Sequence, residues 1–540
     1  MADDLHRALV GGPTAQEPTI GRRDFLRYSG MGAAVIGGAA VLTACGSSAP
    51  SSSTSPASAA AGKPKIGGTL RAGLTGGTGS DTLDAHQGVN NVDFARIISL
   101  YDPLIAFDLN AQNQLRLAES ITPNSDATVW TVRLHPGVTF HNGKPLTAED
   151  VIYTFTRIIT NNYPAASSLA SIEYKNLKAL DTLTVQIPCR SPYATLPDAM
   201  AGYNYYMGIV PVGYDPKNPV GTGPFKYRSF TPGEQSTFVR NDHYWDSSAG
   251  PYVDTLVITD YPDETSQVNA FVSGQADVVN LLSATSIPQV QAAGNILTAA
   301  GGGMTPFTMR VDQPPFTDAR VRQAFRLICD RPQMQDLVFG GRGTIGNDIF
   351  SPFDPEFDHS IPQRTQDIPQ AKSLLKAAGQ EGLSIELVTA DLAQGTIKVA
   401  EVFAQQAAAA GVTVNLRQVT VTEFYGSNYL KWVFAQDYWY YSKYLPQVAQ
   451  ATLPVSPFNE THWDDSAYNK LYSQAIATVD PVARTAIAHE MQQIDYSIGG
   501  YIIPYFPPTI DGYAKNVQGV AATKDGLSLG SYNFKAMWLA

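Results

Sequence analysis

The chain has 540 residues, of which 44% are hydrophobic, and its formal net charge at pH 7 is −11. This length exceeds the size of one ordinary hydrophobic core, so we expect two or three domains in a soluble, globular body. The acidic balance disfavours nucleic acid as a partner and leaves neutral or cationic solutes as the expected ones.

The N-terminal segment has the pattern of an export signal. Arg22 and Arg23 open the stretch "RRDFL", which resembles the twin-arginine export motif. An uncharged run, Met31 to Ala44, follows and is too short to cross a bilayer, which takes about 20 apolar residues. We therefore predict that residues 1–44 are an export signal and not a membrane helix.

Cys45 closes the sequence "LTAC", which resembles a bacterial lipobox. In such signals the cysteine is lipidated and becomes the first mature residue; the alternative is an ordinary cleavage site followed by a chance cysteine. Two or more acyl chains anchor a protein stably, so we expect a lipid-anchored protein on the outer face of the membrane or in the periplasm. Residues 45–65 would be the lipidated end and a flexible tether, because Gly46 to Gly62 contains neither charge nor large apolar side chains.

The first clear regular elements lie between residues 127 and 160. Alternating residues in "ATVWTVRLHPGVTF" (127–140) predict a strand. The stretch "PLTAEDVIYTFTRIIT" (145–160) predicts a helix that Thr147 caps, with acidic residues in its first turn. Val151, Phe155 and Ile158 would share its buried face, together with Ile152 and Ile159.

Helices and strands alternate in the later part of the chain. Residues 316–334 predict one helix, with Val321, Ala324, Phe325 and Ile328 inward. Residues 368–379 predict a second helix, which begins near a proline and stops at a glycine. Strands at 383–390 and 412–419 flank a helix between them. This βαβ-like arrangement indicates an α/β fold.

Six segments occur in the order typical of one known family. They are "GGTLRAGL" with Leu83-Asp84, "LYDPLIAFD", residues 117–155, residues 220–245, "FVSGQADVV" and residues 314–331. Together they resemble the extracytoplasmic solute-binding proteins of family 5, which serve peptide and nickel ABC importers. The resemblance implies a periplasmic-binding-protein-like fold of type II, with two lobes joined by a hinge and the first lobe in two subdomains.

The resemblance also implies a discontinuous domain layout. The first lobe would comprise residues 66–106 and 213–305, an accessory subdomain at 107–212, and a return at 505–540. The second lobe would comprise residues 306–504. The expected function is capture of a small organic solute and its delivery to an ABC permease and ATPase. The expected solute is a peptide or a peptide-like molecule, and a cationic solute is one alternative. No catalysis and no cofactor are implied, and we expect a monomer.

The stretch "FAQDYWYYSKY" (434–444) surrounds one carboxylate with aromatic rings. If it is extended, Asp437, Trp439 and Tyr441 share one face. A buried carboxylate needs a partner, and a ligand ammonium would supply one while Trp439 adds a cation–π contact. In peptide-binding relatives an aspartate in this region holds the peptide's amino group, although the surrounding motif here differs. The alternative is that these rings are packed core.

Arg310 lies at the expected start of the second lobe, beside the cleft. Its guanidinium suits a ligand carboxylate, which it would bind with two parallel hydrogen bonds. A salt bridge on the hinge side is the other interpretation. Our candidate ligand-binding residues are therefore Asp437, Trp439, Tyr441 and Arg310.

Other chemistry finds less support in the sequence. His135 and His141 lie six residues apart, but a metal takes three or four ligands and no further ligand is near, so we expect no metal site. A secreted hydrolase is the rival class, yet the chain has no His-Glu-x-x-His motif. An oligosaccharide ligand stays open, because aromatic walls also suit sugar rings. We expect Cys189 and Cys329 to be buried free thiols, with a disulfide as the lesser alternative.

Overall fold

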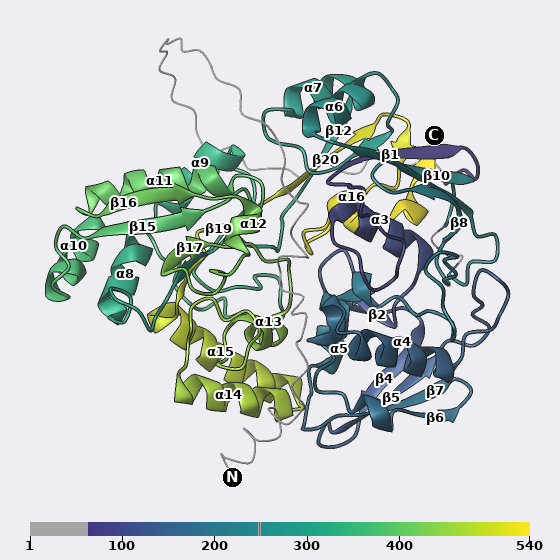
Figure 1. Cartoon of the computed structure of the whole chain (residues 1–540), viewed down its shortest axis with the longest axis horizontal. Helices are drawn as coiled ribbons and strands as arrows, with labels where there is room; N and C mark the ends of the chain where they lie inside the picture. Colours follow the sequence, from purple (N-terminus) through teal and green to yellow (C-terminus); the bar gives the residue numbers. More distant parts are fainter. Residues whose placement is uncertain (1–62, 247, 249) are drawn as a thin grey trace.

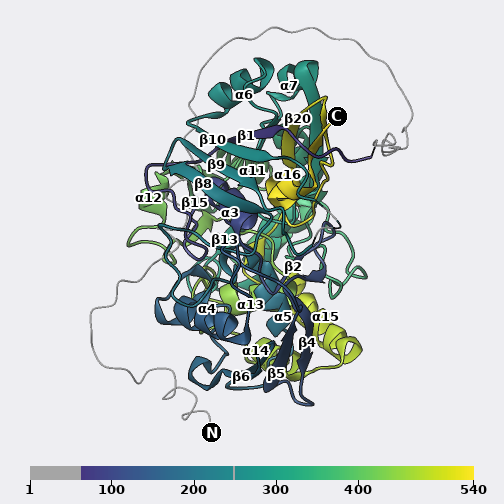
Figure 2. The same ribbon diagram turned by 90° about the vertical axis from the view of Figure 1, so that its right-hand side faces the viewer.

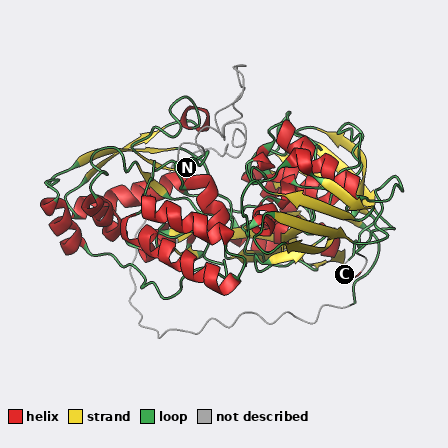
Figure 3. Ribbon diagram, turned by 90° about the horizontal axis from the view of Figure 1, so that it is seen from below, coloured by secondary structure: helices red, strands yellow, loops and turns green. Residues whose placement is uncertain are grey.

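The computed structural model describes residues 63–246, 248 and 250–540, which form two lobes side by side (Figure 1). The expected export signal, with Arg22, Arg23 and Cys45, and most of the tether lie outside the described residues. Within the part that is described, no helix combines the length and the apolar character needed to cross a membrane. Seen from below, the lobes are separate bodies of helices and strands (Figure 3).

Lobe I is built on a seven-stranded mixed sheet. Its order is β12 (Gly294–Ala299), β20 (Thr509–Ala514), β11 (Val278–Val279), β1 (Thr69–Thr75), β10 (Thr255–Tyr261), β9 (Gln235–Arg240) and β8 (Phe225–Thr231). Strand β1 pairs in parallel with β10 and β11, and the other pairs are antiparallel. Helices α6 (Glu264–Val272) and α7 (Ile287–Ala293) lie above this sheet, and α3 (Asn91–Leu100) and the short α16 (Ser528–Tyr532) lie below it (Figure 2).

A smaller antiparallel sheet forms the lower part of lobe I. Its order is β4 (Ala118–Pro123), β5 (Val129–Leu134), β7 (Thr184–Pro188) and β6 (Lys178–Asp181). Helix α4 (Ala148–Thr160) packs on it and buries Val151, Phe155 and Ile158, as the sequence predicts. The Thr147 backbone N–H donates to the Asp150 carboxylate at 3.0 Å, which closes the start of α4. Two further elements belong to this part of lobe I and lie toward lobe II. They are the hairpin of β2 (Ile105–Phe107) with β3 (Asn113–Leu115), and helix α5 (Leu196–Gly202).

Lobe II contains a five-stranded sheet covered by helices. The order is β16 (Thr413–Gln418), β15 (Ser384–Thr389), β17 (Phe434–Gln436), β13 (Phe307–Met309) and β18 (Tyr501–Ile502). Strands β15 and β16 are parallel and joined through α11 (Thr396–Ala409), which confirms the predicted βαβ unit. Helix α10 (Ile368–Ala377) is also found where it was predicted.

The single helix predicted at 316–334 is wrong, because two helices occupy this region. Helix α8 (Ala319–Ile328) ends before Cys329, and α9 (Arg331–Phe339) begins anew. The Asp330 side chain accepts from the Gln333 backbone N–H at 3.0 Å and caps α9, and Pro332 fits its first turn. A local capping signal therefore overrides the continuous apolar periodicity.

The rest of lobe II is helical, and the last three of its helices lie beside the small sheet of lobe I (Figure 1). It comprises α12 (Val421–Phe424), α13 (Tyr444–Ala451), α14 (Ser466–Ala477) and α15 (Pro481–Ile498). Two further short pairs are β14 (Thr344–Ile345) with β19 (Tyr505–Phe506), and β21 (Val517–Gln518) with β22 (Trp538–Leu539).

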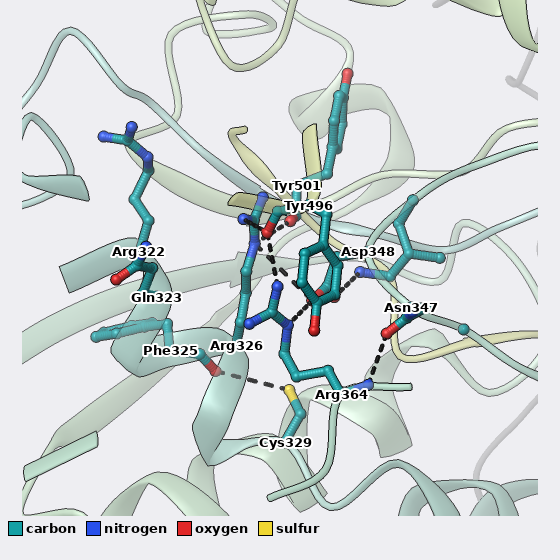
Figure 4. Close-up of polar contacts among 12 residues, drawn as sticks. Arg322, Gln323, Phe325, Arg326, Cys329, Asn347, Asp348, Arg364, Tyr496 and Tyr501 are labelled. Carbon is teal, nitrogen blue, oxygen red and sulfur yellow. Dashed lines mark hydrogen bonds and ion pairs between the residues drawn. The ribbon is translucent and has the colours of Figure 1, made fainter. Parts of the chain in front are cut away.

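The core of lobe II encloses a buried ion cluster around Asp348 (Figure 4). Both Asp348 oxygens accept from Arg331, at 2.8 and 2.9 Å, and Arg364 donates at 2.9 Å. Burial alone would raise the pKa of Asp348, but the guanidiniums of Arg331, Arg326 and Arg364 outweigh it and hold that pKa below its usual range. The cluster joins α8, α9 and the loop after β14 into one unit.

Both cysteines within the described residues are free and buried, which confirms that prediction. Cys329 lies beside the ion cluster, and its thiol donates to the Phe325 carbonyl at 3.8 Å. Burial raises the pKa of both thiols to about 12. Neither is therefore a reactive thiolate at neutral pH.

The chain crosses between the lobes twice. The first crossing leads from β12 to β13 through residues 300–306, and the second leads from β19 to β20 through Pro507 and Pro508. Glycines line the first crossing: a Cβ at Gly301 would stand 2.0 Å from the Pro507 carbonyl oxygen, and one at Gly302 would stand 2.6 Å from that of Lys524. The two crossing segments therefore touch backbone to backbone.

Candidate ligand-binding cleft

The aromatic run continues β17 along the first crossing. The Asp437 N–H donates to the Pro306 carbonyl at 3.1 Å. Trp439 and Met304 then exchange two backbone hydrogen bonds, each of 2.9 Å. The run is therefore held at the boundary between the lobes.

The Asp437 carboxylate is held inside lobe II. It is 1% exposed and accepts from the hydroxyls of Tyr425, at 2.5 Å, and Tyr429, at 3.2 Å. The Tyr438 N–H donates a third hydrogen bond, of 2.7 Å. Both tyrosines follow α12, a segment that the sequence analysis did not connect with the carboxylate.

Trp439 and Arg310 use their polar groups within lobe II. The Trp439 indole N–H donates to Glu460 at 3.1 Å, and Glu460 also accepts from the Tyr501 hydroxyl at 3.1 Å. Arg310 forms an ion pair of 2.7 Å with Asp312 and donates to the Leu430 carbonyl at 3.1 Å. The Arg310 side chain thereby lowers the pKa of Asp312. The structure thus brings Trp439 and Arg310 together with lobe II groups, and not with lobe I.

Tyr440 and Tyr441 instead face aromatic side chains of lobe I. The Tyr440 ring lies 6.1 Å from Phe94 and 6.3 Å from Tyr205, edge to face in both cases. The Tyr441 ring lies 5.4 Å from Phe107. The wall of the cleft is therefore aromatic on both sides.

Sequence analysis missed the lobe I half of this wall. Phe94 belongs to α3, Phe107 to β2, and Tyr205 to the stretch "GYNYYM" (202–207). That stretch is a second dense aromatic run, and it is the sequence feature that could have indicated the lobe I half of the wall.

A small cavity lies where the lobes meet. Lobe II contributes Tyr440 and Tyr441 to its lining; the lobe I residues are Phe107, Ala201, Gly202, Asn204, Tyr205, Asp525 and Leu527. Its volume open to the centre of a water molecule is about 10 Å³, enough for roughly one water. The lobes are therefore closed on one another.

Polar contacts also join the lobes. Lys443, just before α13, forms an ion pair of 2.8 Å with Asp198 of α5, and both side chains are nearly buried. Gln112 donates to the Phe353 carbonyl at 3.0 Å, and Gln394 donates to the Leu282 carbonyl at 3.0 Å. These contacts span the cleft at several points.

A larger cavity, of about 670 Å³, lies wholly within lobe I. Its charged groups are paired with one another: Lys535 with Asp246 at 3.0 Å, and Arg116 with Asp246 at 3.2 Å. Since neither crossing nor lobe II lines it, we do not take it as the cleft.

The two histidines considered for metal binding have separate structural roles. The His135 ring stacks on Trp245 at 5.5 Å. His141 contacts the Gly223 carbonyl at 3.0 Å and accepts from the Gly221 N–H at 3.2 Å. Burial lowers the pKa of His141 to about 4. Among the residues that the structure describes, no group of three or more potential ligands could hold a metal ion.

Comparison with known families decides the assignment. The model of a family described as "Bacterial extracellular solute-binding proteins, family 5 Middle" matches residues 113–472. The chain belongs to this family. It is a solute-binding protein of the extracytoplasmic space, not an enzyme, and its fold is that of type II periplasmic binding proteins. The predictions of family, fold class and absence of catalysis are thereby confirmed.

Individual relatives of this family 5 protein are distant. The oligopeptide-binding protein AppA of Bacillus subtilis (strain 168) is 28% identical over 361 residues, which span 63% of this chain and 64% of AppA. The glutathione-binding protein GsiB of Shigella dysenteriae serotype 1 is 25% identical over 485 residues, 82% of this chain and 90% of GsiB. The crystal structure of CtaP from Listeria monocytogenes superposes with a TM-score of 0.77 at 20% identity, over 88% of this chain and 100% of CtaP.

Proposed function

We propose that this family 5 protein captures a small organic solute between its lobes and delivers it to an ABC importer. The observation that carries the proposal is the aromatic wall that Tyr440 and Tyr441 complete with Phe94, Tyr205 and Phe107 across the lobe boundary. A ligand between such walls contacts both lobes, so it favours the closed form. The permease would recognise that form.

The solute we propose is a peptide or a peptide-like molecule with an amino group. AppA and GsiB are named for oligopeptide and glutathione binding. Asp437 accepts hydrogen bonds from two tyrosine hydroxyls and a backbone amide. A ligand ammonium would add a charge-assisted hydrogen bond to this carboxylate. We propose Asp437 and Tyr441 as ligand contacts; Trp439 and Arg310 already serve partners within lobe II.

A neutral oligosaccharide is the second candidate ligand, because the wall is rich in aromatic rings. Native mass spectrometry of the protein purified from its host tests both candidates. Retained peptide or another amine would support the first, and retained sugar would replace it. Protein that comes without cargo would then be titrated with tripeptides and with oligosaccharides in parallel.

We also propose that Cys45 carries a lipid anchor and that residues 45–65 tether the lobes to the membrane. The support is the lipobox pattern and the composition of the tether. Cys45→Ser should move the protein from the membrane fraction to the soluble fraction of its host. Persistent membrane association of that variant would contradict the anchor.

A further inference from the structure

Tyr441 brings an unused polar group to the lobe boundary. The residue is 4% exposed and lines the small cavity between the lobes. Its hydroxyl has no hydrogen-bond partner among the described residues. Leaving a buried hydroxyl without a partner costs free energy, so a group that pairs with it here would be stabilised.

Asp525 brings a carboxylate to the same cavity from lobe I. It is 7% exposed, and its oxygens accept from the Ser531 hydroxyl and from the Leu527 N–H, the latter at 2.9 Å. No ion pair involves it within the described part of the chain. Burial raises the pKa of Asp525, because a desolvated charge without a counter-ion is costly.

The position of Asp525 is tied to the hinge. A Cβ on its neighbour Gly526 would stand 3.3 Å from the Gly303 nitrogen, so this loop rests against the first crossing. Asp525 of lobe I and Tyr441 of lobe II therefore line one cavity next to the hinge.

The surroundings of Tyr441 are acidic. Asp198, Asp354 and Asp525 all influence its hydroxyl electrostatically. Lys443 pairs with Asp198, whereas Asp354 accepts backbone amides, among them the Tyr444 N–H at 2.6 Å. Three carboxylates therefore act on this hydroxyl, and Lys443 forms an ion pair with one of them, so a cation that enters here would be attracted.

We infer that Asp525 of lobe I and Tyr441 of lobe II form a subsite for a cationic side group of the solute. This inference rests on the proposed function and narrows it to solutes that carry a basic group in addition to the amino group near Asp437. An ammonium would pair with Asp525 and donate to the Tyr441 oxygen, so it would bridge the lobes. It is also about the size of the single water that the closed cavity admits, whereas a ring is not.

The test uses tripeptides Ala-Ala-Ala in which one position is replaced in turn by lysine, arginine or norleucine. Norleucine matches the apolar stem of lysine without its charge. Calorimetry on the full mature protein should find at least one lysine peptide bound about 30-fold tighter than its norleucine counterpart, and the arginine peptides should gain less, because a guanidinium is larger than one water. Asp525→Asn should abolish that preference, and Tyr441→Phe should reduce it about three- to tenfold.

One control variant and the milder of the two substitutions keep the result interpretable. Glu490→Gln removes one negative charge from the exposed surface of α15 and should leave the preference unchanged. Asp525 accepts a hydrogen bond from Ser531 in its own loop, so Asp525→Asn could disturb residues 523–531. Tyr441→Phe keeps the ring against Phe107 and removes only the hydroxyl, so it remains informative in that case.

The outcomes separate this inference from the function beneath it. Equal affinity for lysine and norleucine peptides would overturn the inference and leave the peptide proposal standing. Retention of the preference in both Asp525→Asn and Tyr441→Phe would do the same. Failure of every tripeptide to bind would overturn the peptide proposal, and the inference with it.

Discussion

At the scale of single residues, Asp437 is the most informative position for the proposed ligand. Its carboxylate is buried and held by Tyr425, Tyr429 and a backbone amide. Tyr440, three residues on, lies against lobe I rings. In the proposed site, Asp437 would therefore report on the charge of the ligand, and Tyr440 would report on its shape.

Asp437→Asn and Tyr440→Leu should weaken binding in an order that depends on the ligand. For a cationic ligand, Asp437→Asn should cost about 2–5 kcal/mol of binding free energy, because it removes one member of a buried charge pair. Tyr440→Leu should cost about 1–3 kcal/mol through lost ring contacts. A neutral sugar reverses the order. Calorimetry measures both; if both affinities stay within about twofold of the parent while both variants fold normally, the run is core and not a ligand wall.

His86 predicts a pH-dependent contribution to stability. Its ring is fully buried, with Nε2 at 2.9 Å from the Gly208 carbonyl and Nδ1 facing Arg157. Burial first, and then the Arg157 charge, lower the pKa of His86 to about 4. The unfolded state binds the proton below about pH 6.5, so the stability that neutral His86 contributes is present above that pH and is lost as the pH falls toward 4.

The wild-type protein should therefore lose about 2 kcal/mol between pH 7.5 and pH 5 that His86→Gln does not lose. Urea unfolding of both proteins at the two pH values measures the difference. Burial raises the pKa of Asp511 to about 7, so this carboxylate changes stability with pH in the opposite direction. Its contribution is the same in both proteins and cancels in the comparison. A gap between the two proteins that is the same at both pH values would contradict a neutral His86.

At the scale of elements, the crossing at residues 300–306 is the part on which closure depends. It contacts the second crossing at Pro507 and the loop that carries Asp525. It also exchanges backbone hydrogen bonds with Trp439. Side chains have little room here, which accounts for three successive glycines.

Gly302→Ala should hinder closure. The new Cβ would stand 2.6 Å from the Lys524 carbonyl oxygen of lobe I and 2.6 Å from the Tyr441 ring of lobe II. Such overpacking typically costs about 1–3 kcal/mol. Here the cost destabilises the closed form, because the close contacts exist in that form. We expect ligand affinity to fall while the unfolding midpoint changes little. Gly79→Ala is the control, because a Cβ there meets nothing within 4 Å; an equal effect of both substitutions would exclude a role specific to the hinge.

At the scale of the whole molecule, the described arrangement is a closed one. Lys443–Asp198, Gln112–Phe353 and Gln394–Leu282 contacts join the lobes at several points. The pKa of Lys443 is raised, because Asp198 and Asp354 outweigh the burial that opposes its charge. Opening of the lobes would therefore break these polar contacts together with the ring contacts of Tyr440 and Tyr441.

Lys443→Met should shift the unliganded protein toward an open form. Loss of a partly buried ion pair between the lobes changes the balance by about 0.5–3 kcal/mol. Small-angle scattering should show a larger radius of gyration than in the parent, and ligand should restore the smaller value. Lys398→Met removes an exposed ion pair with Glu401 within α11 and should leave the radius unchanged. If neither ligand nor either substitution changes the radius of gyration from that of the parent, the cleft is rigid.

The amino-acid sequence alone determined the local elements and the family. Helix α4 follows from Thr147, the acidic first turn and the spacing of Val151, Phe155 and Ile158, all of which act within a few residues of one another. The βαβ unit of lobe II follows in the same way. Short motifs in a fixed order were sufficient for the family, and the family model that matches residues 113–472 confirms it.

Only the tertiary structure decided which side chains meet in the cleft. Alternation along 436–441 placed Trp439 with Asp437 and Tyr441, yet Trp439 donates to Glu460 in lobe II and Tyr441 faces Phe107 of lobe I. Beyond Gln436 only an isolated bridge between Trp439 and Met304 continues the strand, so a strict period of two no longer orients the side chains. Tyr441 and Asp525 line one cavity although they belong to different lobes, and no periodicity within one segment encodes the proximity of segments that far apart in the chain.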